Sequence, residues 1–383
     1  MSNSYTHLRG LQRIDPDAAA RCATRLIRMR DSLRPLRERR VDGSLLLATW
    51  NIRDFDSNKF GFGPRLPESF AYIAEIIACF DLVAVQEVNE DLAALERVMR
   101  ILGPGWDYIA TDITEGTSGN GERMAFVYDT RRVRFQRIAG EVVLPEGQLV
   151  VSPRTQREGD ALDPAAVTDA VSQGIEEVRQ QFARTPFVVA FQSGWFKFNL
   201  CTVHIYFGDD SGAQLERRID EIRKLVGFFA KRQDRENRDT SGDPAKMQNY
   251  ILLGDFNVVS PQHETMAALK RRGFIIPPEI DGENMRGPED HFYDQIAVRV
   301  KDERFRVRSG GLVDMFADVF RNTLEDQAIY QETIEKTPDR RTWSPEARYL
   351  NWRTWQMSDH RPLWIEVETD FADHYLEQFA TGT

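Results

Sequence analysis

The residues best suited to chemistry stand at the ends of short apolar runs. Ile251-Leu252-Leu253 is typical of a buried strand, and Gly254-Asp255-Phe256-Asn257 follows it directly. Residues two apart in an extended backbone point to the same face, so the Asp255 carboxylate and the Asn257 carboxamide leave the strand together. This pair suits binding of a metal or a phosphate, although an ordinary Asp-x-Asn turn has the same pattern.

Other strand-like runs have residues of the same chemical kinds at one of their ends. These further candidates are Asn51, Glu87, His204, Asp294, Asp359 and His360. Carboxylates and carboxamides are hard oxygen ligands, which suit Mg²⁺ or Mn²⁺ better than zinc. Histidines beside carboxylates suit proton transfer near neutral pH. A cation, a base and an acid are what the hydrolysis of a phosphate ester requires.

Two of these residues also have ordinary structural interpretations. Glu87 ends the buried run Leu82–Val88, where a bare carboxylate would be costly, so we expect it to have a partner. A metal and a structural salt bridge both satisfy that expectation. Taken alone, His204 could be an ordinary half-buried histidine of a strand. The presence of the other candidate residues favours a catalytic role for it.

Six segments that contain these residues occur in an order that resembles a known superfamily. They are Thr49-Trp50-Asn51-Ile52-Arg53, Val85-Gln86-Glu87-Val88, Thr202-Val203-His204, Gly254-Asp255-Phe256-Asn257, Tyr293-Asp294-Gln295-Ile296 and Ser358-Asp359-His360. The order is similar to that of the endonuclease/exonuclease/phosphatase superfamily. The combination of Asn51–Phe55, Glu122-Arg123 at the start of a strand and His204 most resembles its deoxyribonuclease-I-like branch.

The resemblance implies a role for each candidate. Glu87, Asn51 and Asp359 would hold Mg²⁺, with Mn²⁺ as an alternative, and Asn51 would also contact the substrate phosphate. His360, held by Asp294, would be the general base or would position it, and His204, held by Glu122, would be the general acid. Asp255 and Asn257 would orient the attacking water, and Arg184 would contact a phosphate.

The resemblance also implies a fold, an activity and two classes of substrate. The expected fold is an α/β (α+β) sandwich of two packed mixed β-sheets flanked by helices, in four layers. The expected activity is Mg²⁺-dependent hydrolysis of phosphodiesters, with nucleic acid, DNA first, as the substrate. The alternative is a phosphatase or phosphodiesterase that acts on a phospholipid, an inositol phosphate or another small phosphate ester. A binding module with an inactive site is a third class, which the complete set of candidates disfavours.

Charge and composition restrict the partners. Residues 1–40 contain ten arginines and four acidic residues, and the net charge of the chain is −10, so the remainder carries −16. An acidic body does not hold nucleic acid by bulk electrostatics, although a nuclease with local contacts remains compatible with it. No apolar run is long enough for a membrane span, and the sequence shows no signal-peptide core. Three scattered cysteines suit a reducing compartment, so we expect a cytoplasmic protein.

One catalytic domain is expected over residues 41–370, with a basic helical extension at 1–40 and a tail at 371–383. Asp15-Pro16 caps a helix whose apolar stripe, from Cys22 to Leu36, predicts docking on the domain; a nucleic-acid or membrane-binding arm is the alternative. Further helices are expected near 68–79, 91–102 and 213–230, with a polar loop over 231–249.

Two insertions are expected beside the candidate site. In the one at 145–186, Asp163-Pro164 predicts a helix along Val167, Val171, Val178 and Phe182. The one at 322–356 carries Trp343, Trp352 and Trp355, which could line the substrate site. We expect that these tryptophans pack the insertion onto the domain instead.

Overall fold

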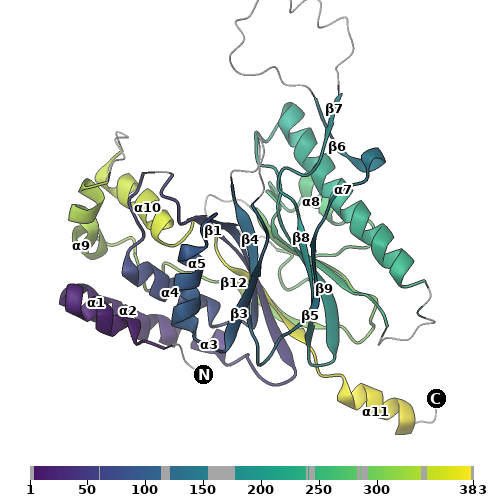
Figure 1. The fold of residues 1–383 in the computed structure, drawn as a ribbon, viewed down its shortest axis with the longest axis horizontal. Coiled ribbons are helices and arrows are strands. Elements are labelled where there is room, and N and C mark those ends of the chain that lie inside the picture. Colours follow the sequence, from purple (N-terminus) through teal and green to yellow (C-terminus); the bar gives the residue numbers. More distant parts are fainter. Residues whose placement is uncertain are drawn as a thin grey trace, which may run out of the picture.

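Two mixed β-sheets lie face to face, and helices cover their outer faces (Figure 1). The computed structural model describes residues 4–59, 61–113, 121–153, 177–238, 240, 246–282, 285, 292–337 and 343–380 of the 383. One sheet has the strand order β12-β13-β1-β2-β4-β3, and the other β11-β10-β9-β8-β5. The expected sandwich of two helix-flanked mixed sheets is confirmed.

The elements have the following bounds. The strands are β1 Ser44–Phe55, β2 Leu82–Val88, β3 Trp106–Ala110, β4 Arg123–Asp129, β5 Arg134–Glu141, β6 Val150–Pro153, β7 Glu177–Gln180, β8 Phe187–Ser193, β9 Phe196–His204, β10 Tyr250–Asp255, β11 Asp294–Arg299, β12 Val307–Leu312 and β13 Leu363–Glu368. The helices are α1 His7–Ile14, α2 Pro16–Ser32, α3 Arg34–Arg37, α4 Pro67–Ile77, α5 Ala93–Leu102, α7 Gly212–Glu236, α8 Glu264–Leu269, α9 Leu324–Glu335, α10 Pro345–Gln356 and α11 Ala372–Ala380, with a 3₁₀ turn η1 at Glu146–Gln148.

A parallel pair of strands lies inside each sheet. β1 runs parallel to β2, and β9 runs parallel to β10. Residues of these strands are buried on both faces, which explains their nearly continuous apolar sequences. The carboxyl ends of parallel neighbours meet at one edge of a sheet, and β1 and β2 contact β10 across the sandwich. This geometry gathers the polar residues at or near the carboxyl ends of the four strands.

The core has two parts, one on each side of the six-stranded sheet. Leu45 and Leu47 of β1 point between the sheets, into a core that also holds apolar residues of α7. Leu46 and Trp50 point the other way, toward α2, α4 and α5. The alternation along one strand therefore serves both layers.

The arginine-rich extension is docked on the body of the protein. Cys22, Leu26 and Met29 of α2 are buried, as the apolar stripe predicts. The helix ends at Ser32, two residues after which α3 begins, consistent with a break imposed by Pro35. Several arginines of the extension pair with buried acids of the body: Arg21 with Glu68, Arg25 with Asp326, Arg30 and Arg37 with Glu75, and Arg40 with Asp81 and Asp129.

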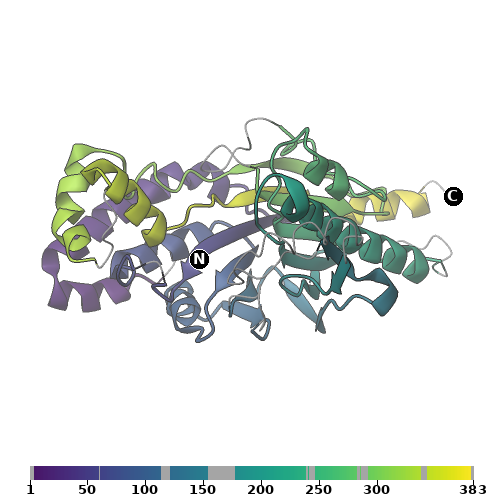
Figure 2. The same ribbon diagram turned by 90° about the horizontal axis from the view of Figure 1, so that it is seen from above.

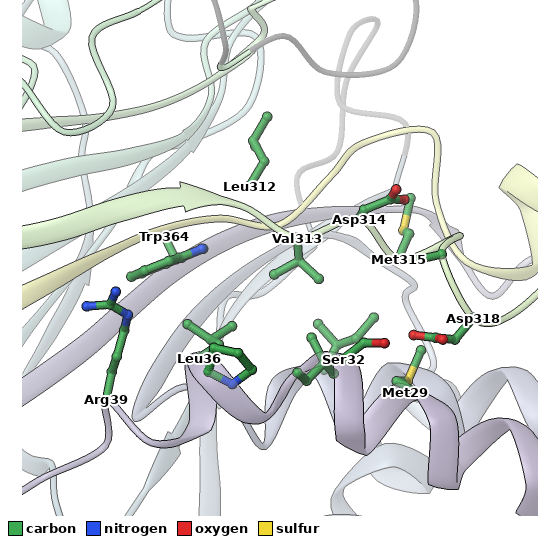
Figure 3. A pocket seen from close by; sticks show the side chains of 14 residues that line it. Met29, Ser32, Leu36, Arg39, Leu312, Val313, Asp314, Met315, Asp318 and Trp364 are labelled. Carbon is green, nitrogen blue, oxygen red and sulfur yellow. The ribbon is translucent and has the colours of Figure 1, made fainter.

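A largely apolar hollow of about 380 Å³ remains where α2 and α3 face the segment after β12 (Figure 3). Arg39, Asp314 and Asp318 are its charged residues, and Arg39 forms an ion pair with Glu366 at 3.0 Å. None of the candidate site residues is among the residues that line it.

Two of the expected elements differ from the structure. The helix expected from Asp163 to Phe182 falls mostly outside the described residues, and Val178 lies in strand β7, which pairs with β6 in a ribbon. The loop expected over 231–249 is too long, because α7 continues to Glu236. The side-chain amide of Gln233 donates to the carbonyls of Gln248 and Arg299. These hydrogen bonds hold the last turns of α7 against the sheet, which explains why the helix is longer than expected.

The insertion at 322–356 contains α9 and α10, which lie at the opposite end of the molecule from α11 (Figure 2). Trp352 and Trp355 are fully buried there, so they pack the insertion onto the body, as expected. No described helix is both long and apolar enough to span a lipid bilayer.

Candidate active site

A glycine brings the ends of β9 and β10 unusually close together. Gly254 has φ +133°, and a Cβ built there would lie 2.2 Å from the carbonyl oxygen of Val203. No side chain fits at that position, which explains the glycine before Asp255. In this register Asp255 is the neighbour of His204 on one side and of Asp294 on the other.

Asp255 lies between the two candidate histidines. Its Oδ2 atom is 3.6 Å from His204 Nε2 and 3.8 Å from His360 Nε2. The side chain of Asn51 donates to the same oxygen at 3.1 Å, and the backbone N–H of Asn257 donates to Oδ1 at 2.9 Å. Asp255 is only 2% exposed. Residues from three distant segments, together with Asn257 two positions on, therefore converge on one carboxylate.

Each histidine has a second carboxylate behind it. His360 Nδ1 is hydrogen-bonded to Asp294 Oδ2 at 2.7 Å, and His204 Nδ1 lies 3.1 Å from Glu122 Oε2. A carboxylate at Nδ1 fixes the orientation of an imidazole and leaves Nε2 for the reacting groups. Both Nε2 atoms face Asp255. The structure thus brings together the two acid–histidine pairs that the sequence suggests.

These charges shift the pKa values in opposite directions. Burial alone would lower the pKa of His360, but Asp294 and Asp255 outweigh it and raise that pKa well above its usual value. Burial would raise the pKa of Asp255, yet His360 and His204 hold it below its usual value. In Asp294 burial prevails and the pKa is raised. His360 therefore carries a proton at neutral pH while Asp255 is ionised.

Asn51 and Glu87 come from adjacent parallel strands. Asn51 Nδ2 donates to Glu87 Oε1 at 3.1 Å, and the backbone N–H of Asp54 donates to Glu87 Oε2 at 2.8 Å. Glu87 has φ +58°, in the left-handed region that non-glycine residues seldom occupy, whereas Asn257, at φ +51°, is of a residue type that adopts this region readily. Backbone strain of the kind seen at Glu87 concentrates at functional sites, which supports a functional role for that residue.

The donor set fits a divalent cation. Carboxylate atoms of Glu87 and Glu122 and a ring nitrogen of His204 lie within 4.8 Å of one another. Beside them, the Oδ1 atom of Asn51 is buried without a hydrogen-bond partner among the described residues. A buried orphan oxygen costs free energy that a cation would recover. A site dominated by oxygen favours Mg²⁺ or Mn²⁺.

The remaining predicted residues have other immediate partners. Arg184 Nε donates to Glu122 Oε2 at 2.8 Å, so the guanidinium lies behind the carboxylate that faces His204. The Asn257 side chain donates to the carbonyl of Ile205 at 2.7 Å. Asp359 is 36% exposed and forms an ion pair with Arg53 at 3.3 Å, and it is not in the acidic group around Glu87. Its role as a metal ligand remains a proposal.

The sequence reasoning missed several residues at the rim. Lys59 Nζ lies 3.7 Å from Glu122 Oε1, which places a positively charged side chain beside the site. The Phe207 ring is 54% exposed and meets the edge of the Tyr293 ring, which in turn lies 5.9 Å from the ring of His360. The one available signal was position, since Phe207 stands three residues after His204 and Lys59 eight residues after Asn51.

Comparison with known proteins gives structures but no sequence relatives. No family model matches the chain, and no curated protein matches it. A mannosyl-6-phosphatase from Bacteroides thetaiotaomicron is 19% identical, with a TM-score of 0.49, over 84% of this chain and 99% of that one. An endonuclease/exonuclease/phosphatase family protein from the same organism is 18% identical, with a TM-score of 0.48, over 85% and 98%. The human nocturnin catalytic domain with bound sulfate is 13% identical, with a TM-score of 0.48, over 85% and 95%.

The chain combines two mixed sheets flanked by helices with the six ordered motifs. The polar residues of these motifs meet at one edge of the sheets. The sheets have six and five strands, the two-sheet sandwich that the resemblance of the motifs implies. With identities below 20% and TM-scores below 0.5, the solved structures are likenesses that carry no argument about activity or substrate. What this member does has to follow from its own site.

Proposed function

We propose that the protein is a phosphoric ester hydrolase that depends on a divalent metal. The observation that supports this most strongly is the position of Asp255 Oδ2, which is 3.6 Å and 3.8 Å from the Nε2 atoms of His204 and His360. Two imidazoles with their own carboxylates and one shared acid form a set suited to proton transfer.

The three residues take complementary parts in an in-line attack by water. Asp255, ionised and deeply buried, orients the attacking water and accepts the proton that the water loses. His360, protonated by virtue of Asp294, stabilises the negative charge that develops on the phosphate oxygens. His204 donates a proton to the leaving oxygen, with Glu122 fixing its ring. Asn257 steadies the transition state beside them.

Glu87, Asn51 and Glu122 would hold the cation, and Asp359 is a further candidate. A bound divalent ion offsets the negative charge of the site and polarises the phosphate. Glu87, Glu122 and Asp255 concentrate negative charge at the site, and a divalent ion would reduce their repulsion of an anionic substrate.

A deoxyribonuclease-I-like nuclease is our first candidate, on the strength of the ordered motifs and of the exposed Phe207 ring at the rim. An exposed aromatic ring beside a phosphate site is suited to stacking on a nucleobase. A phosphatase or phosphodiesterase of small phosphate esters is the second candidate. It is favoured by the ion pairs of the N-terminal arginines, because guanidinium groups engaged with Glu68 and Glu75 are not available as a DNA-binding arm.

A parallel substrate assay separates the two candidates. The protein is incubated with Mg²⁺ and with supercoiled DNA, RNA, a synthetic phosphodiester, inositol phosphates or phospholipids. Nicking of DNA supports the nuclease, and release of inorganic phosphate with DNA intact supports the second candidate. The variants Asp255→Asn and His204→Ala should each lose activity, by about 10²–10⁴-fold for the histidine.

The matched control is Asp373→Asn, which alters an exposed acid in the first turn of α11 and should keep full activity. Turnover that survives Asp255→Asn, or the absence of turnover on every substrate, would contradict the proposal. Retained binding of a partner without turnover would instead indicate a binding module.

A further inference from the structure

A second cavity, of about 480 Å³, lies between the start of the chain and α5. Its walls come from residues 4–14, from Pro67 at the start of α4 and from the last turns of α5. One side is closed by the backbone N–H of Ser4, which donates to the carbonyl of Ile101 at 3.2 Å. None of the candidate active-site residues lines this cavity, so it is a separate feature of the molecule.

The charged side chains that line this cavity are all basic. Arg97 and Arg100 stand three residues apart on α5, and His7 faces them from α1, with no Asp or Glu among the lining residues. Within the described ranges, neither guanidinium has a hydrogen bond or an ion pair. Arg97 stacks on the Phe70 ring at 4.2 Å. The charge of Asp56 reaches it, but that carboxylate is paired with Arg65 at 3.3 Å.

This surplus of positive charge is unusual for the surrounding structure. The chain has a net charge of −10, and nearby arginines such as Arg21 and Arg30 are paired with Glu68 and Glu75. The guanidinium groups of Arg97 and Arg100 have no such partner among the described residues, and they repel each other. Burial and the charge of Arg100 lower the pKa of Arg97, and burial together with Arg97 lowers the pKa of His7. An anion between them would remove this repulsion.

We propose that the cavity binds the phosphate group of a small phosphorylated molecule between Arg97 and Arg100. Guanidinium groups match phosphate oxygens in geometry as well as in charge. The hydroxyl groups of Ser4 and Thr6, 2.9 Å apart at the rim, offer further donors. The volume lies in the range of small-molecule sites, about 300–1,000 Å³, and leaves room for an organic group beside the phosphate. This site does not depend on the function proposed above.

The imidazole of His7 provides a direct readout. In metal-free protein, the His7 resonances are assigned with His7→Gln and followed over pH by NMR, with inorganic phosphate and with a nucleoside monophosphate in separate titrations. A bound anion stabilises the imidazolium form, so each ligand should raise the pKa of His7 in a saturable manner. Tighter binding of the monophosphate would identify the organic ester as the preferred source. The resonances of His204 and His360 report on the active site separately, so failure of one proposal is distinguishable from failure of the other.

Three variants complete the test. Arg97→Gln/Arg100→Gln should abolish the response of His7, whereas Arg9→Gln/Arg13→Gln, which removes two exposed charges from α1, should retain it. The exposed side chain of Arg100 also allows Arg100→Glu, which should abolish the response even if the double variant fails to fold. A His7 pKa that does not respond to either ligand, or that responds equally in Arg100→Glu, would overturn the proposal.

Discussion

At the scale of single residues, the site depends on how Asp255 is held. The carboxylate accepts hydrogen bonds from Asn51 and from the backbone of Asn257, and it lies within 4 Å of both candidate histidines. Asn51 and the two histidines come from other segments of the chain. The close approach of β9 and β10, which Gly254 permits, places His204 beside the carboxylate.

Substitution of Gly254 by alanine tests this packing. The added Cβ would clash with the Val203 carbonyl and push β10 away from β9. We expect activity to fall by about 10²-fold, because a displacement of about 1 Å has that effect on a catalytic group. Gly227→Ala is the matched control, since a Cβ added there on helix α7 would meet no described atom beyond the helix backbone within 4 Å. Equal activity of the two variants would show that Gly254 is not required for the geometry.

A second residue-level prediction concerns Asp294. In Asp294→Asn the negative charge beside His360 Nδ1 is removed, so the pKa of His360 should fall. NMR titration of the metal-free protein measures this directly. If protonated His360 is the active form, the alkaline limb of the activity profile should also move to lower pH. An unchanged His360 pKa would contradict the assigned contact.

Much of the site could be predicted at this scale because strand ends place side chains predictably. Asp255 and His204 end buried strands and Asp294 begins one, and the register of these strands brings the three residues side by side. Lys59 and Phe207 could not be found in this way. Their loops have no periodicity, so the direction of their side chains depends on tertiary contacts.

At the scale of elements, α2 shows how a basic segment becomes part of the body. Arg25 is 5% exposed, and its guanidinium donates to Asp326 at 2.8 Å and to the hydroxyl of Tyr330 at 2.8 Å. Both partners belong to α9, so α2 fastens the late insertion as well as covering the sheet. A basic side chain of the extension thus stabilises the acidic body through a buried ion pair.

Removal of this buried arginine should destabilise the protein. Arg25→Ala leaves Asp326 with Arg321 as its remaining ion-pair partner, and we expect the free energy of unfolding to fall by about 3 kcal/mol. Arg28→Ala, at an exposed position of the same helix, should change it by less than about 0.5 kcal/mol. Denaturant unfolding of the two variants measures the difference. Equal stability, with weaker DNA binding by Arg25→Ala, would restore the alternative of a nucleic-acid arm.

The sequence predicted the long apolar strands and the docked helix because their periodicity is strong. It missed β5 and β12, whose residues are largely half-buried or exposed and therefore lack an apolar signature. β12 contains Ser309-Gly310-Gly311, a sequence typical of a turn. Its pairing with β13 is decided by tertiary contacts, since a Cβ on Gly310 would lie 2.5 Å from Ile280.

At the scale of the whole molecule, one buried carboxyl links stability to pH. Glu221 lies on α7, fully buried, and accepts a hydrogen bond from the backbone N–H of Ala183 at 3.1 Å. Burial raises its pKa from 4.5 to about 7, against the opposing effects of that hydrogen bond and of Arg217 and Arg184. The folded protein therefore holds this proton more tightly than the unfolded chain does.

Because this pKa is raised on folding, the contribution of Glu221 to the free energy of unfolding falls as the pH rises. The contribution of Glu221 to stability is fully present below pH 4.5 and is lost as the pH rises through about 7. In Glu221→Gln this loss should disappear, so the variant should gain about 3 kcal/mol on the wild type between pH 4.5 and pH 8. Unfolding free energies of both proteins across this range provide the measurement. A constant difference would show that Glu221 titrates normally.

The central claim is that His204 and His360 act as one unit around Asp255. The most direct test is a double-mutant cycle with His204→Ala, His360→Ala and the double variant, assayed with Mg²⁺ on the substrate that the wild type turns over. His374→Ala, at an exposed position of α11, is the control and should retain full activity. We predict that each single variant loses most of its activity. The double variant should have nearly the same activity as the less active single variant, because the effects of substitutions in residues that act as one unit do not add. Full activity in either single variant, or losses that multiply, would contradict the account.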